Sequence, residues 1–294
     1  MTLSRLRLAC LTLAAALLGA CGAEAIDDHE EVAHVAGDVM SSFDEASQGG
    51  AFASRGLPFM RERGVLGPSP WQRVAAALLP EAHAAGCSMV VFSTCTAGAR
   101  SKTFNACSFG TATLSGSVTL TFSDTAACSM AEVPDSVTRE ANFTLTGRRG
   151  ASLTVSAPGG GQRITRTPTG FAFSVLGLNR VLTAADGTKL AELSTRTLSD
   201  LSVTGSSRAN RVMNGGEIEV KHALRNTTTT LTPEHLAWSS TCNCAVSGKL
   251  TGSTTAADAK VTAFELELTG CGTAQLTAKG RTRALTFDRC ATVQ

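Results

Sequence analysis

The sequence predicts an all-β fold, a large antiparallel sheet of roughly 12–15 strands preceded by a short helical leader. From Ser88 onward, hydrophobic and polar residues alternate with a period of two, which is typical of strands with one buried face. Turn-forming residues rich in Gly, Pro and Asn separate the alternating runs. No long helical pattern interrupts them, which excludes a βαβ architecture.

The strands follow one another in sequence order. The clearest alternating runs are residues 118–122, 143–146, 153–155, 217–220 and 264–268. Threonine fills many of the polar positions, and its β-branched side chain suits a pleated, half-exposed surface. Turns are predicted at residues 147–150, 158–161, 186–187, 214–216, 249–252 and 279–280. The pattern leaves open whether the strands form one curved sheet or a sandwich of two packed sheets.

An internal repeat predicts two disulfides. The segment from Cys107 to Cys128 resembles the one from Cys271 to Cys290, with a similar order of Cys, Leu, Phe and Asp. Folding the later segment about residues 280–281 places Cys271 opposite Cys290. Folding the earlier one about Ser117 places Cys107 opposite Ala127, one residue from Cys128, a mismatch that a bulge would absorb. We therefore expect Cys107–Cys128 and Cys271–Cys290 as hairpin cross-links.

Four further cysteines remain, and Cys242 and Cys244 are expected to pair with Cys87 and Cys95 in a connectivity that the sequence leaves open. Residues at i and i+2 of a strand share a face, so Cys242 and Cys244 could chelate a metal. Structural zinc sites use wider spacing and more ligands, however, and exported proteins favour disulfides. We therefore expect disulfides here, and no metal or cofactor.

The first 20 residues have the pattern of an export signal. Arg5 and Arg7 form a basic start, and residues 6–18 are an apolar run shorter than the roughly 20 residues of a membrane-spanning helix. The sequence Leu18-Gly19-Ala20-Cys21 that follows resembles the lipobox of bacterial lipoproteins. This resemblance covers the signal region alone, and it implies that Cys21 becomes the acylated first residue of the mature chain.

Two neighbouring features bear on where the mature chain resides. Gly22 follows the cysteine, and the absence of Asp at this position favours the outer membrane. Residues 23–25, Ala-Glu-Ala, form an alternative cleavage site. Cleavage after Ala25 would remove Cys21 and release a soluble secreted or periplasmic protein.

Residues 21–86 form a leader and linker, and residues 87–294 form the β domain. Val32, Val35, Val39 and Phe43 recur at helical spacing and predict an amphipathic helix. A second short helix is predicted at residues 71–79 between two prolines. Residues 22–50 contain eight acidic residues and no Lys or Arg, whereas residues 87–294 contain 20 basic and 14 acidic residues, a net charge of +6. An acidic leader exposed to solvent beside a mildly basic domain explains this asymmetry. The alternative is that the acidic leader is attracted to the basic domain, or that the domain contacts anionic lipid headgroups.

Composition and motifs disfavour several functions. Aromatic residues make up 5% of the chain and Tyr is absent, so stacking platforms for nucleic acids or sugars are not expected. No G-x-S-x-G motif occurs, and the β domain contains only His222 and His235 as histidines. We interpret His222 as solvent-facing and His235 as part of a turn. The pairs Glu217/Glu219 and Glu265/Glu267 are interpreted as the wet faces of strands rather than as a glycosidase pair.

Three functions are compatible with the sequence. The first is a non-catalytic lipoprotein of the cell envelope whose β domain contacts an envelope protein or polymer. The second is a periplasmic or outer-membrane carrier that holds a hydrophobic ligand in a half-barrel sheet. The third and least favoured is a secreted hydrolase, which would need His222 or His235 beside an acid and a serine.

Overall fold

The computed structural model describes residues 92–109, 112–205, 208–242, 244–256, 261–287 and 290. This part of the chain forms one antiparallel sheet of 14 strands, so the all-β prediction is confirmed. The sequence left open whether the strands form one curved sheet or a sandwich, and the structure shows one sheet. The predicted signal peptide and the helical leader of residues 21–86 lie outside the described residues.

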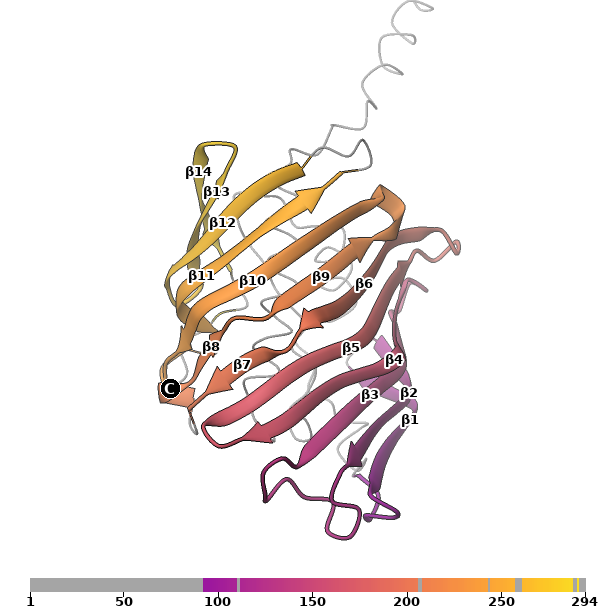
Figure 1. Cartoon of the computed structure of the whole chain (residues 1–294). Coiled ribbons are helices and arrows are strands. Elements are labelled where there is room, and N and C mark those ends of the chain that lie inside the picture. Colours follow the sequence, from indigo (N-terminus) through magenta and orange to yellow (C-terminus); the bar gives the residue numbers. More distant parts are fainter. Residues whose placement is uncertain are drawn as a thin grey trace, which may run out of the picture.

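The strands pair mainly with their neighbours in sequence. Their order across the sheet is β1-β2-β3-β4-β5-β6-β9-β10-β11-β12-β13-β14, and Figure 1 shows them running diagonally across the domain. The bounds are β1 (Ala99–Phe109), β2 (Ala112–Phe122), β3 (Ser136–Thr146), β4 (Ser152–Thr167), β5 (Gly170–Thr183), β6 (Lys189–Ser199), β7 (Leu201–Thr204), β8 (Val212–Asn214), β9 (Glu217–His222), β10 (Thr227–Trp238), β11 (Ala245–Thr255), β12 (Val261–Gly270), β13 (Thr273–Ala278) and β14 (Arg281–Thr286).

Two short strands complete the sheet off the main path. β7 pairs with one half of β5, and β8 pairs with β7 and with one half of β10. The other halves of β5 and β10 pair with β6 and β9. The β7–β8 hairpin therefore continues the sheet beyond the ends of β6 and β9 and keeps the two halves joined over the full strand length.

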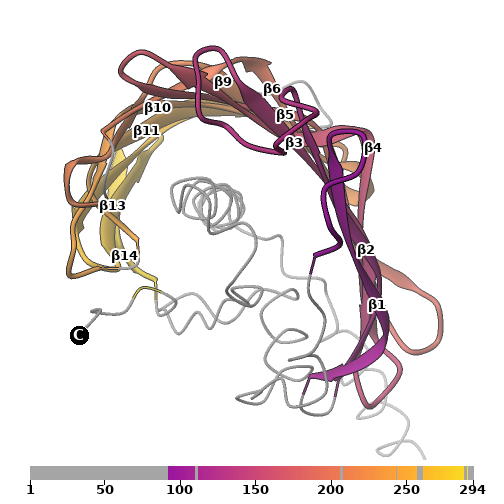
Figure 2. The same cartoon turned by 90° about the horizontal axis from the view of Figure 1, so that it is seen from below.

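The sheet is strongly curved. Figure 2 shows an open arc with β1 at one end and β14 at the other. Register shifts interrupt β1, β4, β5, β10 and β12, and such bulges bend a strand and increase its twist. A sheet of this many strands curls because the right-handed twist accumulates from strand to strand.

Three predicted turns are wrong, and at two of them glycine serves packing rather than chain reversal. Residues 158–161 lie inside β4 at a register shift, and residues 249–252 lie inside β11. Gly252 pairs with Phe264, and a Cβ atom at Gly252 would come within 2.9 Å of the Phe264 ring. The turns predicted at residues 147–150, 186–187 and 279–280 do reverse the chain between successive strands and are confirmed. Residues 214–216 do not reverse it, because β8 and β9 both pair antiparallel with β10 and therefore run in the same direction.

Candidate functional site: the concave apolar face

One face of the sheet is continuously apolar. Residues that pair directly across antiparallel strands project to the same face, so the register defines rows of side chains. One row runs from Pro233 through Leu250 and Leu266 to Leu276, and the three leucines are fully buried. A second row joins Phe122, Val137, Ile164, Phe173 and Leu201 at the other end of the sheet.

The apolar face is assigned to the concave side of the arc. Side chains converge on the inside of a curved sheet and diverge on the outside, so only the inner face can pack its own side chains closely. The buried apolar residues alternate along each strand with intermediate or exposed Thr, Ser, Lys and Glu. The period-two pattern of the sequence therefore corresponds to this division between an inner and an outer face.

A polar row crosses this face and passes near the ends of β10, β11 and β12. Thr195 pairs with Val220, and the row continues through Thr229 and Thr254 to Thr262. All four threonines are buried, and the hydroxyl oxygens of Thr229 and Thr254 lie 2.9 Å apart in a hydrogen bond. Pairing the hydroxyls with each other lowers the cost of burying them among leucines.

The charged residues of the concave face are basic. Arg100 and Arg139 share a row with Leu120. Arg180 lies between Val155 and Leu193. Lys102 pairs with Val118, and Arg283 pairs with Leu276. The carboxylates of the described strands project to the opposite face; they are Glu140, Glu192, Glu217, Glu219, Glu234, Glu265 and Glu267. The concave face thus combines a hydrocarbon-like surface with positive charge.

The outer face neutralises its carboxylates locally, as the interpretation of the Glu pairs as wet faces predicts. Lys249 Nζ lies 2.9 Å from Glu265 Oε1, and Arg196 Nε donates to Glu219 Oε1 at 2.7 Å. Burial opposes ionisation of Glu219, but hydrogen bonds and attraction from Arg196 and Lys221 outweigh it and lower the pKa of Glu219. These carboxylates are therefore held as ion-pair partners across neighbouring strands.

The two histidines lie in different places from those predicted. His222 pairs with Leu193 and Thr227 in a row of the concave face, so its interpretation as solvent-facing is wrong. His235 lies inside β10 at a bulge rather than in a turn, and its N–H donates to Asn214 Oδ1 at 3.0 Å. β10 runs through Pro233 because that residue faces the gap between β8 and β9, where no partner strand requires its missing N–H.

The described residues form three disulfides, Cys95–Cys128, Cys242–Cys271 and Cys244–Cys290. Six of the eight predicted disulfide residues are therefore cross-linked, but the predicted pairings Cys107–Cys128 and Cys271–Cys290 are wrong. The expected pairing of Cys242 and Cys244 with Cys87 and Cys95 is wrong as well. Cys107 is buried and forms no disulfide with another described cysteine, and Cys87 and Cys21 lie outside the described residues.

A shift of register explains the error at Cys271. The turn of the last hairpin is Lys279-Gly280, so Ala278 pairs with Arg281. The predicted cysteine pairing assumes a fold about residues 280–281, one residue later, which would pair each residue with a partner two positions further on. A two-residue shift keeps every side chain on its face, so the apolar pattern fits both registers equally well.

The error at Cys107 has a different cause. β2 runs straight through Ser117, where a turn was predicted, and pairs with β1 on one side and β3 on the other. Gly116 has a φ of +126°, and a Cβ atom there would come within 2.9 Å of Phe143 Cβ. The glycine therefore permits close approach of β3, which the sequence alone does not distinguish from a turn.

The disulfides tie down both ends of the arc. Cys95–Cys128 joins the segment before β1 to the loop after β2, and the other two join the β10–β11 loop to the chain around β13 and β14. Edge strands have a hydrogen-bonding partner on one side only, so they are the parts of an open sheet that separate most easily. The cross-links therefore fix the regions where the sheet is weakest.

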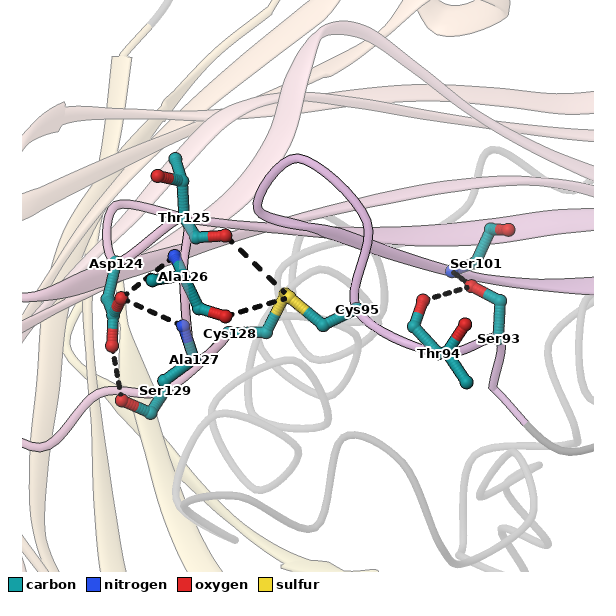
Figure 3. Close-up of a disulfide and its surroundings, with 10 residues drawn as sticks. All are labelled: Ser93, Thr94, Cys95, Ser101, Asp124, Thr125, Ala126, Ala127, Cys128 and Ser129. Carbon is teal, nitrogen blue, oxygen red and sulfur yellow. Dashed lines mark hydrogen bonds between the residues drawn. A yellow bond between two sulfur atoms is a disulfide. The ribbon is translucent and has the colours of Figure 1, made fainter.

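A capped turn supports the first of these cross-links. Asp124 Oδ1 accepts hydrogen bonds from the N–H groups of Ala126 and Ala127, at 3.1 and 3.0 Å, and Ser129 Oγ donates to Asp124 Oδ2 at 2.8 Å (Figure 3). The N–H of Ala127 and the hydroxyl of Ser129 lower the pKa of Asp124. Cys128 therefore leaves the turn in a fixed direction toward Cys95.

We expect Asp124→Asn to lower the melting temperature near neutral pH and to have little effect in acid. Because the folded-state pKa is lowered, the ionised carboxylate stabilises the fold above the ordinary pKa of Asp, and this contribution is lost as the pH falls through the lowered value. Melting curves of both proteins across the acidic range would test this. An equal difference at every pH would contradict it.

The described residues contain no group of three His, Cys, Asp or Glu side chains that could hold a metal ion. They also contain no helix long and apolar enough to cross a membrane. Comparisons with protein-family models, curated proteins and solved structures found no match.

Proposed function

We propose that the protein is a non-catalytic module of the cell envelope that presents its β domain for binding and is held at the outer membrane by acyl chains on Cys21. The observation that carries this proposal is the curved sheet itself, with one continuous apolar face and disulfides at both ends. Disulfides form and persist in exported compartments, in agreement with the export signal. Several acyl chains together give stable attachment to a membrane.

The anchor predicts a defined mature N-terminus. We expect the mass of the mature protein to correspond to a chain that begins at Cys21 and carries acyl groups. Cys21→Ser should move the protein out of the membrane fraction, whereas Cys10→Ser, within the apolar run of the signal, should leave it there. A soluble mature chain that begins at Ile26 would contradict the anchor and support cleavage after Ala25.

A carrier of hydrophobic ligands is the second candidate. It is favoured because the strands form one curved sheet rather than two packed sheets, so no second sheet packs on the concave face within the described residues. Basic residues such as Arg139 and Arg180 on that face suit an amphiphile with an anionic headgroup. Solvent extraction of protein purified without detergent, followed by mass spectrometry, would test this. Recovery of about one amphiphile per chain supports a carrier, and an empty extract contradicts it.

The same compartment implies a fourth disulfide, between Cys87 and Cys107. The N–H of Ser93 donates to the carbonyl of Ser101 at 2.8 Å, next to the edge strand β1. The three observed disulfides leave Cys87 and Cys107 as the two remaining cysteines of residues 87–294, and Cys87 is six residues before Ser93 in the sequence. The two thiols would be oxidised by disulfide exchange with an exported thiol oxidoreductase, which takes up two electrons and two protons.

Thiol counting tests this pairing. Mature protein alkylated in denaturant without reduction should carry no label on the β domain, and Cys107→Ser should expose one thiol, at Cys87. Two labelled thiols in the wild-type protein would contradict the fourth disulfide. That result would leave the three observed cross-links, and with them the proposal of an exported binding module, in place.

A further inference from the structure

The concave apolar face needs a second layer. A sheet with one hydrophobic face is stable when another element packs on that face. All strands of the described residues belong to the one sheet, and the helical elements among them are the 3₁₀ turns Arg208–Asn210 and Ala223–Arg225, which are too short to cover it. The cover must therefore come from another part of the chain, from a second copy or from a bound molecule.

We propose that residues 27–45 of this chain pack on the concave face. Val32, Val35, Val39 and Phe43 recur on one side of a helix and supply an apolar stripe to meet the leucine rows. A helix of 19 residues is about 28 Å long, and strands lie about 4.8 Å apart. Laid across the strands, it would cover the middle of the sheet, where the most deeply buried rows lie.

Charge favours this occupant over the others. Residues 22–50 contain eight acidic residues and no Lys or Arg, and the strand residues of the concave face contribute Arg and Lys but no carboxylate. A second copy packed face to face would place like charges opposite each other, which is unfavourable. A neutral hydrocarbon would leave the basic side chains without counter-charges. An anionic amphiphile would supply them only while it is bound, whereas the acidic segment belongs to the same chain and is therefore always at high effective concentration. An acidic amphipathic segment satisfies both the apolar and the basic parts of the surface.

The course of the chain permits this arrangement. Phe92, the first described residue, packs against the apolar core, and Lys102 of the concave face lies 6.0 Å from its ring centre. The chain therefore enters the sheet from the concave side, next to the edge strand β1. Residues 46–91 separate the proposed helix from this point and can span roughly 150 Å when extended, several times the distance required.

This docking goes beyond the proposed function and does not depend on it. It concerns which segment covers the concave face when no ligand is bound, and it does not require that an amphiphile or an envelope partner binds. An empty lipid extract would therefore leave it intact. Conversely, a leader that does not touch the sheet would leave the export and anchoring proposals intact.

Photo-crosslinking in the full mature chain tests the contact directly. A photoreactive phenylalanine analogue in place of Phe43 should crosslink within the same chain to concave-face residues such as Leu231 or Leu250. The same analogue in place of Ser41, about 200° around the helix, should give little of this product. Crosslinks from position 43 to a second chain, to a lipid or to no part of the sheet would overturn the proposal.

A pair of double variants gives an independent measure. Val35→Glu/Val39→Glu places two carboxylates in the apolar stripe, and His34→Glu/Ser41→Glu adds two on the opposite side of the helix. We expect the first variant to bind a hydrophobic dye roughly twofold or more above wild type and to melt at a lower temperature. The second should resemble wild type. Equal behaviour of the two variants would overturn the proposal, because the effect would then follow from added charge alone.

Discussion

Leu266→Ala is expected to lower the free energy of unfolding of the β domain by about 2–5 kcal/mol. Leu266 is fully buried in β12 and pairs with Leu250 and Leu276 on the concave face. Truncation removes the transfer free energy of the buried methyl groups and leaves a cavity that a sheet fixed by its neighbours cannot fill. Urea unfolding followed by circular dichroism, with disulfides intact, measures the difference.

Glu267→Ala is the matched control. Glu267 is the next residue of the same strand and projects to the outer face. Surface substitutions of this kind change stability by about 0.5 kcal/mol or less. If the two variants were equally destabilised, the division into an apolar inner and a polar outer face would be wrong, and the candidate site with it.

The faces of the sheet could be predicted from the sequence because alternation is a local property. Leu266 and Leu268 are apolar and their neighbours Glu265 and Glu267 are charged, so these four residues alone define a strand and its buried side. The same local pattern predicted much of the remaining sheet. It could not predict the β7–β8 hairpin, because β8 has only three residues and its pairing with β10 depends on strands far away in sequence.

The turn errors show where local signals are ambiguous. Glycine within residues 147–150 ends a strand, whereas Gly252 lies in the middle of one beneath Phe264. Both are glycines in a polar sequence, and only the position of a residue on another strand distinguishes them. The curvature could not be predicted for the same reason, since it depends on bulges defined by pairs of strands.

Disulfide partners were predictable in region but not in identity. The repeat correctly predicted cross-links at the two ends of the sheet, where all three disulfides lie. Pairing depends on register, and a shift by two residues leaves the hydrophobic pattern unchanged. The basic character of the concave face was likewise hidden, because Arg139 and Arg180 are far apart in sequence and share a face only once the strands are paired.

The second large effect is expected for Cys244→Ser/Cys290→Ser. This disulfide closes the longest loop of the three, with a sequence separation of 46 residues, and joins the end of β14 to the start of β11. The loop-entropy model assigns it about 4 kcal/mol, which corresponds to a fall in melting temperature of about 8–16 °C for a domain of this size. The double substitution creates no new unpaired thiol that could exchange with the remaining disulfides. Differential scanning calorimetry of both proteins would measure the shift.

Reductant separates the cross-link from the side chains that form it. In dithiothreitol and with all disulfides opened, wild type and variant differ only by two serines in place of two cysteines, so their melting temperatures should converge. Cys244 is buried, and a serine hydroxyl there would add a smaller penalty that persists in reductant. A difference of the same size with and without reductant would therefore assign the stabilisation to packing rather than to the cross-link. In that case side-chain packing alone would stabilise the end of the sheet at β14.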